Sequence, residues 1–119
     1  MADSHSNMDL VSTPRMEGDA VIICVRGDID LHNSPELRSA ILNMLTQKSV
    51  KRLILNLSQV PYMDSSAIAV LVEALQKLRP TGGRVMLVDL QPRVKGLMEI
   101  ARLDTIFVLA ASEQQALAM

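Results

Sequence analysis

A nearly uninterrupted apolar run from Leu53 to Leu57 constrains the fold of this chain more than any other feature. Only Asn56 is polar, so the run lacks the alternation of apolar and polar residues that marks a strand with one face in water. Runs of this kind are typical of strands in parallel sheets, which helices cover on both faces. The sequence therefore predicts a central strand in an α/β domain.

The rest of the chain alternates strand-like and helix-like segments around this run. An edge strand at residues 10–15 and a strand at 20–26 flank the turn Glu17-Gly18-Asp19, which predicts a hairpin. Further strands are expected at 85–88 and 106–108, and helices at 35–48, 65–78, 92–101 and 112–119. This order predicts a single domain over residues 9–119: a sandwich with a mixed, mostly parallel sheet of about five strands and four helices. Residues 1–8 are expected to form a disordered tail.

Local signals indicate where the helices begin and which side faces the core. Ser34 is expected to cap the first helix ahead of Pro35, and Ser112 to cap the last. Apolar residues at helical spacing are expected to point inward. In the third helix these are Val94, Leu97, Met98 and Ala101.

Composition excludes several classes of protein. Aromatic residues make up 2% of the chain and the formal net charge is −1, so the stacking surfaces and basic grooves of single-strand nucleic-acid binders are missing. The single cysteine, Cys24, excludes an intrachain disulfide and is expected to be a small buried residue. No apolar run reaches the roughly 18 residues of a membrane span and no secretory signal is visible, so a cytoplasmic protein without membrane insertion is expected.

Residues that could support catalysis or metal binding are sparse. The two histidines, His5 and His32, have no cysteine, histidine or acid partner at metal-ligand spacing. The segment Gly82-Gly83-Arg84 lacks the Gly-Lys-Ser/Thr ending of a phosphate-binding loop and is typical of a turn. We therefore expect no enzyme activity, no catalytic residue, no cofactor and no metal.

One segment, Pro61 to Ser66, is a candidate site, because it joins the central strand to a helix N-terminus at a sheet edge where sites often form. The simplest interpretation is structural: Asp64 or Ser65 caps the helix. A second interpretation adds phosphorylation, since a phosphate there would face unpaired backbone N–H groups and the positive end of the helix dipole. It would add about −1.5 to −2 charges beside Asp64. The residues alone leave both interpretations open.

Three segments, in sequence order, resemble the STAS family (sulphate transporter and anti-sigma factor antagonist domains). The family's marker, Asp-Ser-Ser/Thr-Gly-hydrophobic at a helix start, stands here as Asp64-Ser65-Ser66-Ala67-Ile68. Gly27 to Asp30 matches the family's Gly-x-hydrophobic-Asp, and residues 92–107 match its third helix and last strand. The resemblance covers residues 8–107 and is greatest to the stand-alone anti-sigma factor antagonists of bacteria.

The resemblance implies a site and a mechanism. Ser65 takes the position of the family's phospho-acceptor, Ser66 is the alternative, and Asp30 and Asp64 match acids near the acceptor. Unphosphorylated members bind a serine kinase of the histidine-kinase-like ATPase fold that is also an anti-sigma factor, and so free the sigma factor. Phosphorylated members do not bind it, and a serine phosphatase is expected to reverse the switch. Ala67 departs from the family's Gly and adds a methyl group where a kinase backbone could approach.

The expected partner-binding surface consists of the residues around this motif: Asp30, Tyr62, Met63, Asp64, Ser65, Ser66 and Ala67. Tyr62 and Met63 are candidates either for exposed apolar anchors or for core residues beneath the loop. Asp30 is either an acid of the site or part of the entry to the first helix. An alternative function, which Ala67 favours, is a non-phosphorylated STAS subunit of a transporter or signalling assembly. Formation of a homodimer stays open.

Overall fold

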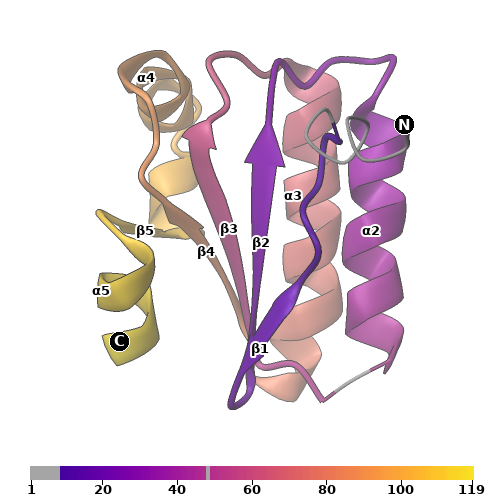
Figure 1. Cartoon of the computed structure of the whole chain (residues 1–119). Coiled ribbons are helices and arrows are strands. Elements are labelled where there is room, and N and C mark those ends of the chain that lie inside the picture. The colour runs from indigo at the N-terminus through magenta and orange to yellow at the C-terminus, as the bar shows by residue number, and fades with distance from the viewer. Residues whose placement is uncertain (1–8, 48) are drawn as a thin grey trace.

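The computed structural model describes residues 9–47 and 49–119 and folds them around one five-stranded sheet (Figure 1). The strands are β1 (Arg15–Glu17), β2 (Ala20–Arg26), β3 (Arg52–Gln59), β4 (Arg84–Val88) and β5 (Val108–Ala110). They lie side by side in sequence order, with β1 antiparallel to β2 and the other neighbours parallel. The predicted mixed, mostly parallel sheet is confirmed, with β3 at its centre.

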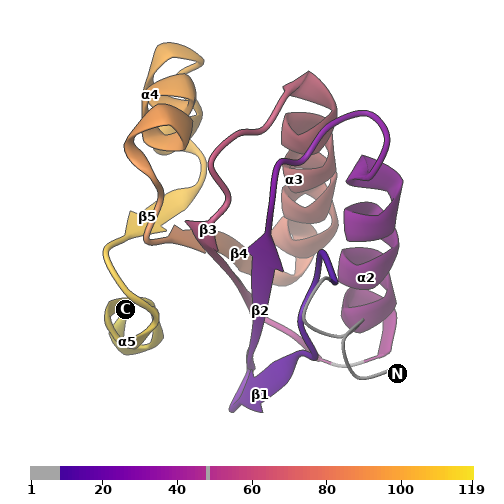
Figure 2. The ribbon, with the colours of Figure 1, turned by 45° about the horizontal axis from the view of Figure 1, so that its top comes forward.

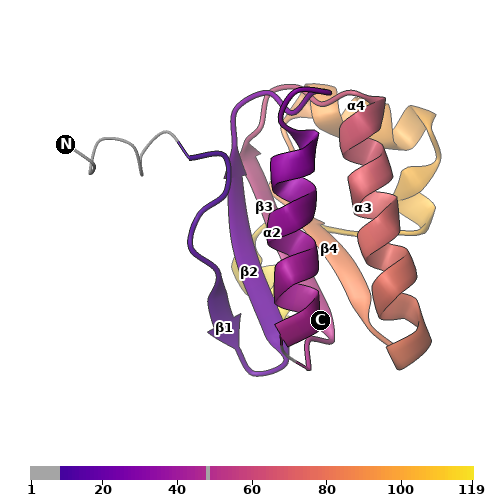
Figure 3. The same cartoon turned by 90° about the vertical axis from the view of Figure 1, so that its right-hand side faces the viewer.

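Within the described residues, four α-helices surround the sheet: α2 (Ser34–Gln47), α3 (Ser65–Leu78), α4 (Pro92–Ile100) and α5 (Glu113–Ala118). Two short 3-10 helices, η1 (Arg79–Thr81) and η2 (Leu103–Thr105), follow α3 and α4. Figures 2 and 3 show α2 and α3 side by side on one face of the sheet, with α5 on the opposite face. The predicted α/β sandwich is therefore confirmed.

Burial on both faces explains the apolar run of β3. Leu53 and Leu55 point into a large core to which α2, α3 and α4 all contribute, whereas Ile54 points into a smaller core with α5. These three side chains are fully buried. A strand covered in this way cannot tolerate alternating polar residues, which is why the sequence pattern identified it.

The polar exception in that run, Asn56, anchors α5 to the sheet. Its Nδ2 donates to Oε2 of Glu113 (2.7 Å), and Arg15 donates to Oε1 of the same carboxylate (2.5 Å). These donors hold the pKa of Glu113 below its ordinary value, the Asn56 hydrogen bond contributing most. Cys24 is half-buried rather than fully buried, and its thiol lies 3.7 Å from Oε2 of the same carboxylate.

Two strands begin later than expected. The edge strand is Arg15–Glu17 instead of residues 10–15, where Val11 makes a single antiparallel bridge to Val25. The last strand is Val108–Ala110 instead of residues 106–108. Ile106 caps the 3-10 helix η2, and Phe107 is buried in the core, so the strand begins only at Val108.

Helix ends also differ in detail. Ser34 is the first residue of α2 rather than its cap, because the carbonyl of Asn33 accepts the first helical hydrogen bonds. Ala101 follows the last residue of α4 and is exposed instead of inward-facing. The cap at Ser112 is confirmed, since its Oγ accepts the N–H of Gln115 at 3.0 Å. The expected tail at 1–8 and the helix end at Lys48 lie outside the described residues.

Candidate functional site

The loop between β3 and α3 lies at the carboxyl edge of the sheet and is fixed to the loop that follows β2. Ile29 and Met63 form an isolated parallel bridge between the two loops. The N–H of Ile29 donates to the carbonyl of Tyr62 (3.0 Å), and the N–H of Asp64 donates to the carbonyl of Ile29 (3.1 Å). Backbone hydrogen bonds therefore help to position the start of α3 independently of its side chains.

Asp64 is the cap of α3, which confirms the structural interpretation and assigns it to Asp64 instead of Ser65. Its Oδ1 accepts the N–H of Ser66 (2.9 Å) and the N–H of Ala67 (3.3 Å). The same oxygen accepts the hydroxyl of Ser66 at 2.5 Å. Two of the N–H groups that a helix leaves unpaired at its start are thus satisfied by one carboxylate.

The pKa of the Asp64 carboxyl is lowered from its ordinary value, chiefly by the hydrogen bond from the Ser66 hydroxyl. The backbone N–H groups of Ala67, Ser66 and Leu31 act in the same direction, while partial desolvation opposes them. The carboxyl is therefore ionised at neutral pH.

Replacing Asp64 by alanine is expected to destabilise the chain at neutral pH, and the loss is expected to shrink in acid. A carboxyl with a lowered folded pKa stabilises the fold above its unfolded pKa of about 3.9, and this contribution disappears as pH falls through the folded value. Urea unfolding of wild type and Asp64→Ala between neutral pH and pH ~3 measures the difference. The exposed Glu99 on α4 supplies the control Glu99→Ala. A stability gap that stays constant across this range would contradict the assignment.

The two serines differ in exposure and in hydrogen bonding. Ser65 is exposed at the first position of α3, and no hydrogen bond of its hydroxyl is found with any described residue. Ser66 is half-buried and its hydroxyl is held by Asp64. An incoming phosphoryl donor can reach the Ser65 hydroxyl without breaking a hydrogen bond to a described residue, whereas reaction at Ser66 breaks the bond between its hydroxyl and Asp64.

The expectation that a phosphate here would face unpaired backbone N–H groups is wrong for two of these groups. The N–H groups of Ser66 and Ala67 are not free to receive it, because Asp64 already accepts both. A phosphate on Ser65 would therefore extend outward, beside a carboxylate of the same sign. The helix dipole attracts it, but its charge is presented to solvent or to a partner.

Asp30 has the helix-entry role of its two alternatives. One carboxylate oxygen accepts the N–H groups of His32 (2.9 Å) and Asn33 (3.2 Å). In return, the side chain of Asn33 accepts the N–H of Asp30 (2.8 Å). This reciprocal pair shapes the loop that leads into α2. Contact of Asp30 with a partner stays a prediction.

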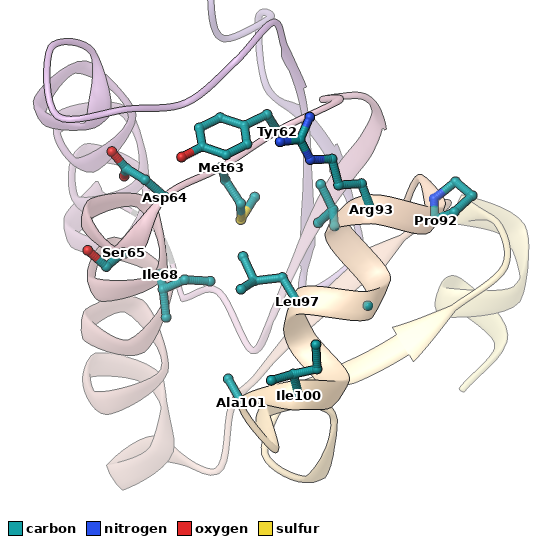
Figure 4. Close-up of a pocket in the computed structure, with 12 residues that line it drawn as sticks. Tyr62, Met63, Asp64, Ser65, Ile68, Pro92, Arg93, Leu97, Ile100 and Ala101 are labelled. Atoms are coloured by element: carbon teal, nitrogen blue, oxygen red, sulfur yellow. The ribbon is translucent and has the colours of Figure 1, made fainter.

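Tyr62, Met63 and Ala67 differ in burial, and Figure 4 shows the first two beside the start of α3. Tyr62 is 36% exposed and stays a candidate anchor, but Met63 is 2% exposed and belongs to the core, so its role as an exposed anchor is wrong. Ala67 is completely buried. Its methyl group cannot meet a kinase backbone in this conformation, so the expected interference with partner approach is wrong as well.

Replacing Ala67 by glycine is expected to lower stability by about 1 kcal/mol and to leave phosphorylation unchanged. Glycine weakens a helix by about this amount, and the methyl group that is lost contacts only the interior. Thermal unfolding measures the first effect, and the initial rate of phosphate incorporation measures the second. An increase in that rate of about tenfold or more would show that the methyl group does restrict the kinase.

A groove between α3 and α4 adjoins the exposed serine and was missed by sequence reasoning. It encloses about 660 Å³ and brings Tyr62, Asp64 and Ser65 together with residues of α4. Among the latter are Arg93, Leu97 and Ile100. Their spacing of four and three residues places them on one face of a helix, beside the core-facing Val94 and Met98. Leu97 and Ile100, apolar residues beside the core-facing stripe of α4, were the sequence signal that could have indicated the groove.

Neither a metal cluster nor a membrane-spanning helix is present in the described part of the chain. No three histidine, cysteine, aspartate or glutamate side chains there are grouped to hold a metal ion. Every helix there is too short or too polar to cross a bilayer. The arrangement around Ser65 offers an exposed hydroxyl beside a groove.

Comparison with known proteins gives consistent matches along most of the chain. The family model described as the STAS domain matches residues 8–116. An anti-sigma-B factor antagonist of Listeria monocytogenes is 34% identical over 88 residues, which are 74% of this chain and 76% of that protein. Two solved structures share the fold. An anti-sigma factor antagonist from Mycobacterium paratuberculosis has a TM-score of 0.80 at 24% identity, covering 89% of each chain. The Bacillus cell fate determinant SpoIIAA in its phosphorylated form has a TM-score of 0.70 at 23% identity, covering 89% of this chain and 96% of that one.

Proposed function

The chain belongs to the STAS domain family, and from that premise we propose that it is an anti-sigma factor antagonist controlled by phosphorylation of Ser65. Unphosphorylated, it binds a serine kinase that is also an anti-sigma factor; phosphorylated, it releases that kinase. It is a binding regulator rather than an enzyme. The proposal places it in the cytoplasm, where sigma factors act.

The observation that carries the proposal is the contrast between neighbouring hydroxyls. Ser65 is exposed, and its hydroxyl makes no hydrogen bond with any described residue, whereas the hydroxyl of Ser66 is committed to the cap. Ser65 also stands at the start of a helix whose cap and loops are already satisfied. Its modification therefore changes the surface without requiring the fold to change.

The kinase would supply ATP and Mg²⁺, and this chain the nucleophile. The Ser65 oxygen attacks the γ-phosphorus and forms a new P–O bond while the bond from phosphorus to the bridging oxygen of ADP breaks. The hydroxyl proton passes to a base of the kinase. A serine phosphatase restores the hydroxyl by hydrolysis of the phosphoester.

The switch acts through charge. The phosphate adds about −1.5 to −2 charges next to the ionised Asp64. A partner surface that fits a neutral hydroxyl must then bury this charge or lie against it, and both cost affinity. Because Asp64 already accepts the N–H groups of Ser66 and Ala67, these two donors are not free to bind the phosphate.

The alternative, a non-phosphorylated subunit of a transporter or signalling assembly, was favoured in the sequence by Ala67. Since Ala67 is buried, its difference from glycine does not alter the surface that a partner meets. The exposed Ser65 hydroxyl favours the phosphorylated regulator over this alternative.

Affinity purification from the cells that encode the chain tests the proposed function. Tagged wild type and Ser65→Ala are expected to retain a histidine-kinase-like ATPase, and Ser65→Asp is expected to lose it. Recovery of a transporter ATPase in place of the kinase, equally with all three proteins, would overturn the proposal.

A further inference from the structure

The groove between α3 and α4 is apolar along its walls and open to the surface (Figure 4). Ile68 of α3 faces Leu97 and Ile100 of α4 across it, and Tyr62 lies at one end. Its volume of about 660 Å³ exceeds what one side chain occupies. A concave apolar surface of this kind is suited to hold a side chain from another molecule.

Exposure within the groove is concentrated on α4. Ile100 is 85% exposed, the largest exposure among the large apolar side chains of the described residues. A Cβ atom added to the neighbouring Gly96 would meet nothing within 4 Å, so this wall is low and leaves room for an incoming chain. A single exposed isoleucine is ordinary, but here it borders a cavity that α3 closes on the other side.

The charges at the groove are arranged asymmetrically. Arg93 lies over the ring of Tyr62, its guanidinium carbon 5.0 Å from the ring centroid. Of the ion pairs found within the described residues, none includes Arg93. Asp64, which is ionised, lines the opposite wall. Figure 4 shows both charges at the end of the groove where Tyr62 lies, on opposite walls, with Ile100 at the far end. The groove therefore offers a cation on the α4 wall and an anion on the α3 wall.

We infer that this groove receives a segment of the kinase that carries a branched aliphatic side chain or a methionine together with an acidic residue. The aliphatic group enters between Ile68 and Ile100, and the carboxylate pairs with Arg93. An acid at the Tyr62 end is attracted by Arg93 and repelled by Asp64, so it lies against the α4 wall, with the aliphatic group farther along the groove toward Ile100.

The inference rests on the proposed function and makes it more specific. Ser65 lines the same groove, so a kinase that reaches its hydroxyl lies directly above the apolar walls. Phosphorylation of Ser65 would weaken these contacts, since a hydrated dianion would then lie at the rim of a surface that must be desolvated when the kinase binds. Residues of α4 thereby determine which kinase recognises the chain.

The test is a binding titration of the unphosphorylated chain against the purified kinase that phosphorylates it. Ile100→Glu and Arg93→Glu are each expected to weaken binding about tenfold or more. Met16→Glu is the matched control, since Met16 is also an exposed apolar residue (43%) but lies on the edge strand β1. Unfolding curves of all variants are expected to match that of wild type, because each side chain is exposed.

Each outcome is decisive. Loss of affinity for the α4 variants alone supports the inference. Wild-type affinity for Ile100→Glu and Arg93→Glu would overturn it while leaving the proposed function intact. Absence of any binding by wild type would overturn both. A dimer of wild type that Ile100→Glu dissociates without change in kinase affinity would show that the groove binds a second copy, which also overturns the inference.

Discussion

The Ser65→Asp chain, and the chain phosphorylated on Ser65, are expected to bind the kinase on the order of 100-fold more weakly than wild type. Removing the hydroxyl in Ser65→Ala is expected to change affinity by no more than about threefold, since it introduces no charge and one neutral hydroxyl contributes little net binding free energy. Isothermal titration with the purified kinase measures all three. The effect is large because charge enters a surface that must lose water on binding.

The control for a serine-to-aspartate change is Ser112→Asp. Ser112 is also exposed and also stands at a helix start, where aspartate caps as well as serine does. It precedes α5, on the opposite face of the sheet from α3. Ser112→Asp is therefore expected to bind as wild type does. Equal weakening by both variants would show that general charge, and not the position of Ser65, controls affinity.

Replacing Met63 by alanine is expected to lower the free energy of unfolding by about 2–5 kcal/mol. Met63 is almost completely buried in the large core, directly below the loop that carries the site. Truncation leaves a cavity under the backbone bridge to Ile29, which holds this loop to its neighbour. Urea denaturation monitored by circular dichroism measures the loss.

Two further variants distinguish packing from surface contact. Met63→Leu keeps most of the volume and is expected to cost less than about 1.5 kcal/mol. Tyr62→Ala removes the adjacent, partly exposed side chain and is expected to cost much less than Met63→Ala. If Tyr62→Ala proved the more destabilising of the two alanine variants, the placement of Met63 in the core and Tyr62 at the surface would be incorrect.

The parts of the fold that could be predicted from sequence are those where one physical requirement dominates. Two-sided burial identified β3, and helical spacing together with strong start and stop signals gave α3 its bounds. The last strand was displaced because the apolar residues 106–108 fit a strand equally well by propensity. Only the packing of Phe107 into the core assigns it to the turn before β5.

The candidate site was located by sequence but not resolved by it. Asp64 and Ser65 are equally good caps by residue type, and the choice between them depends on the bridge that connects Ile29 with Met63. That bridge joins residues far apart in the chain, so local patterns carry no information about it. Local patterns also carry no information about the groove, because its two walls come from separate helices.

Mapping the phosphate by mass spectrometry tests the central claim most directly. The chain is incubated with its purified kinase, ATP and Mg²⁺, alongside Ser65→Ala and Ser66→Ala. We predict one phosphate per chain on Ser65, its retention in Ser66→Ala, and no incorporation in Ser65→Ala. Phosphate on Ser66 in the wild-type chain, or on neither serine, would contradict the account.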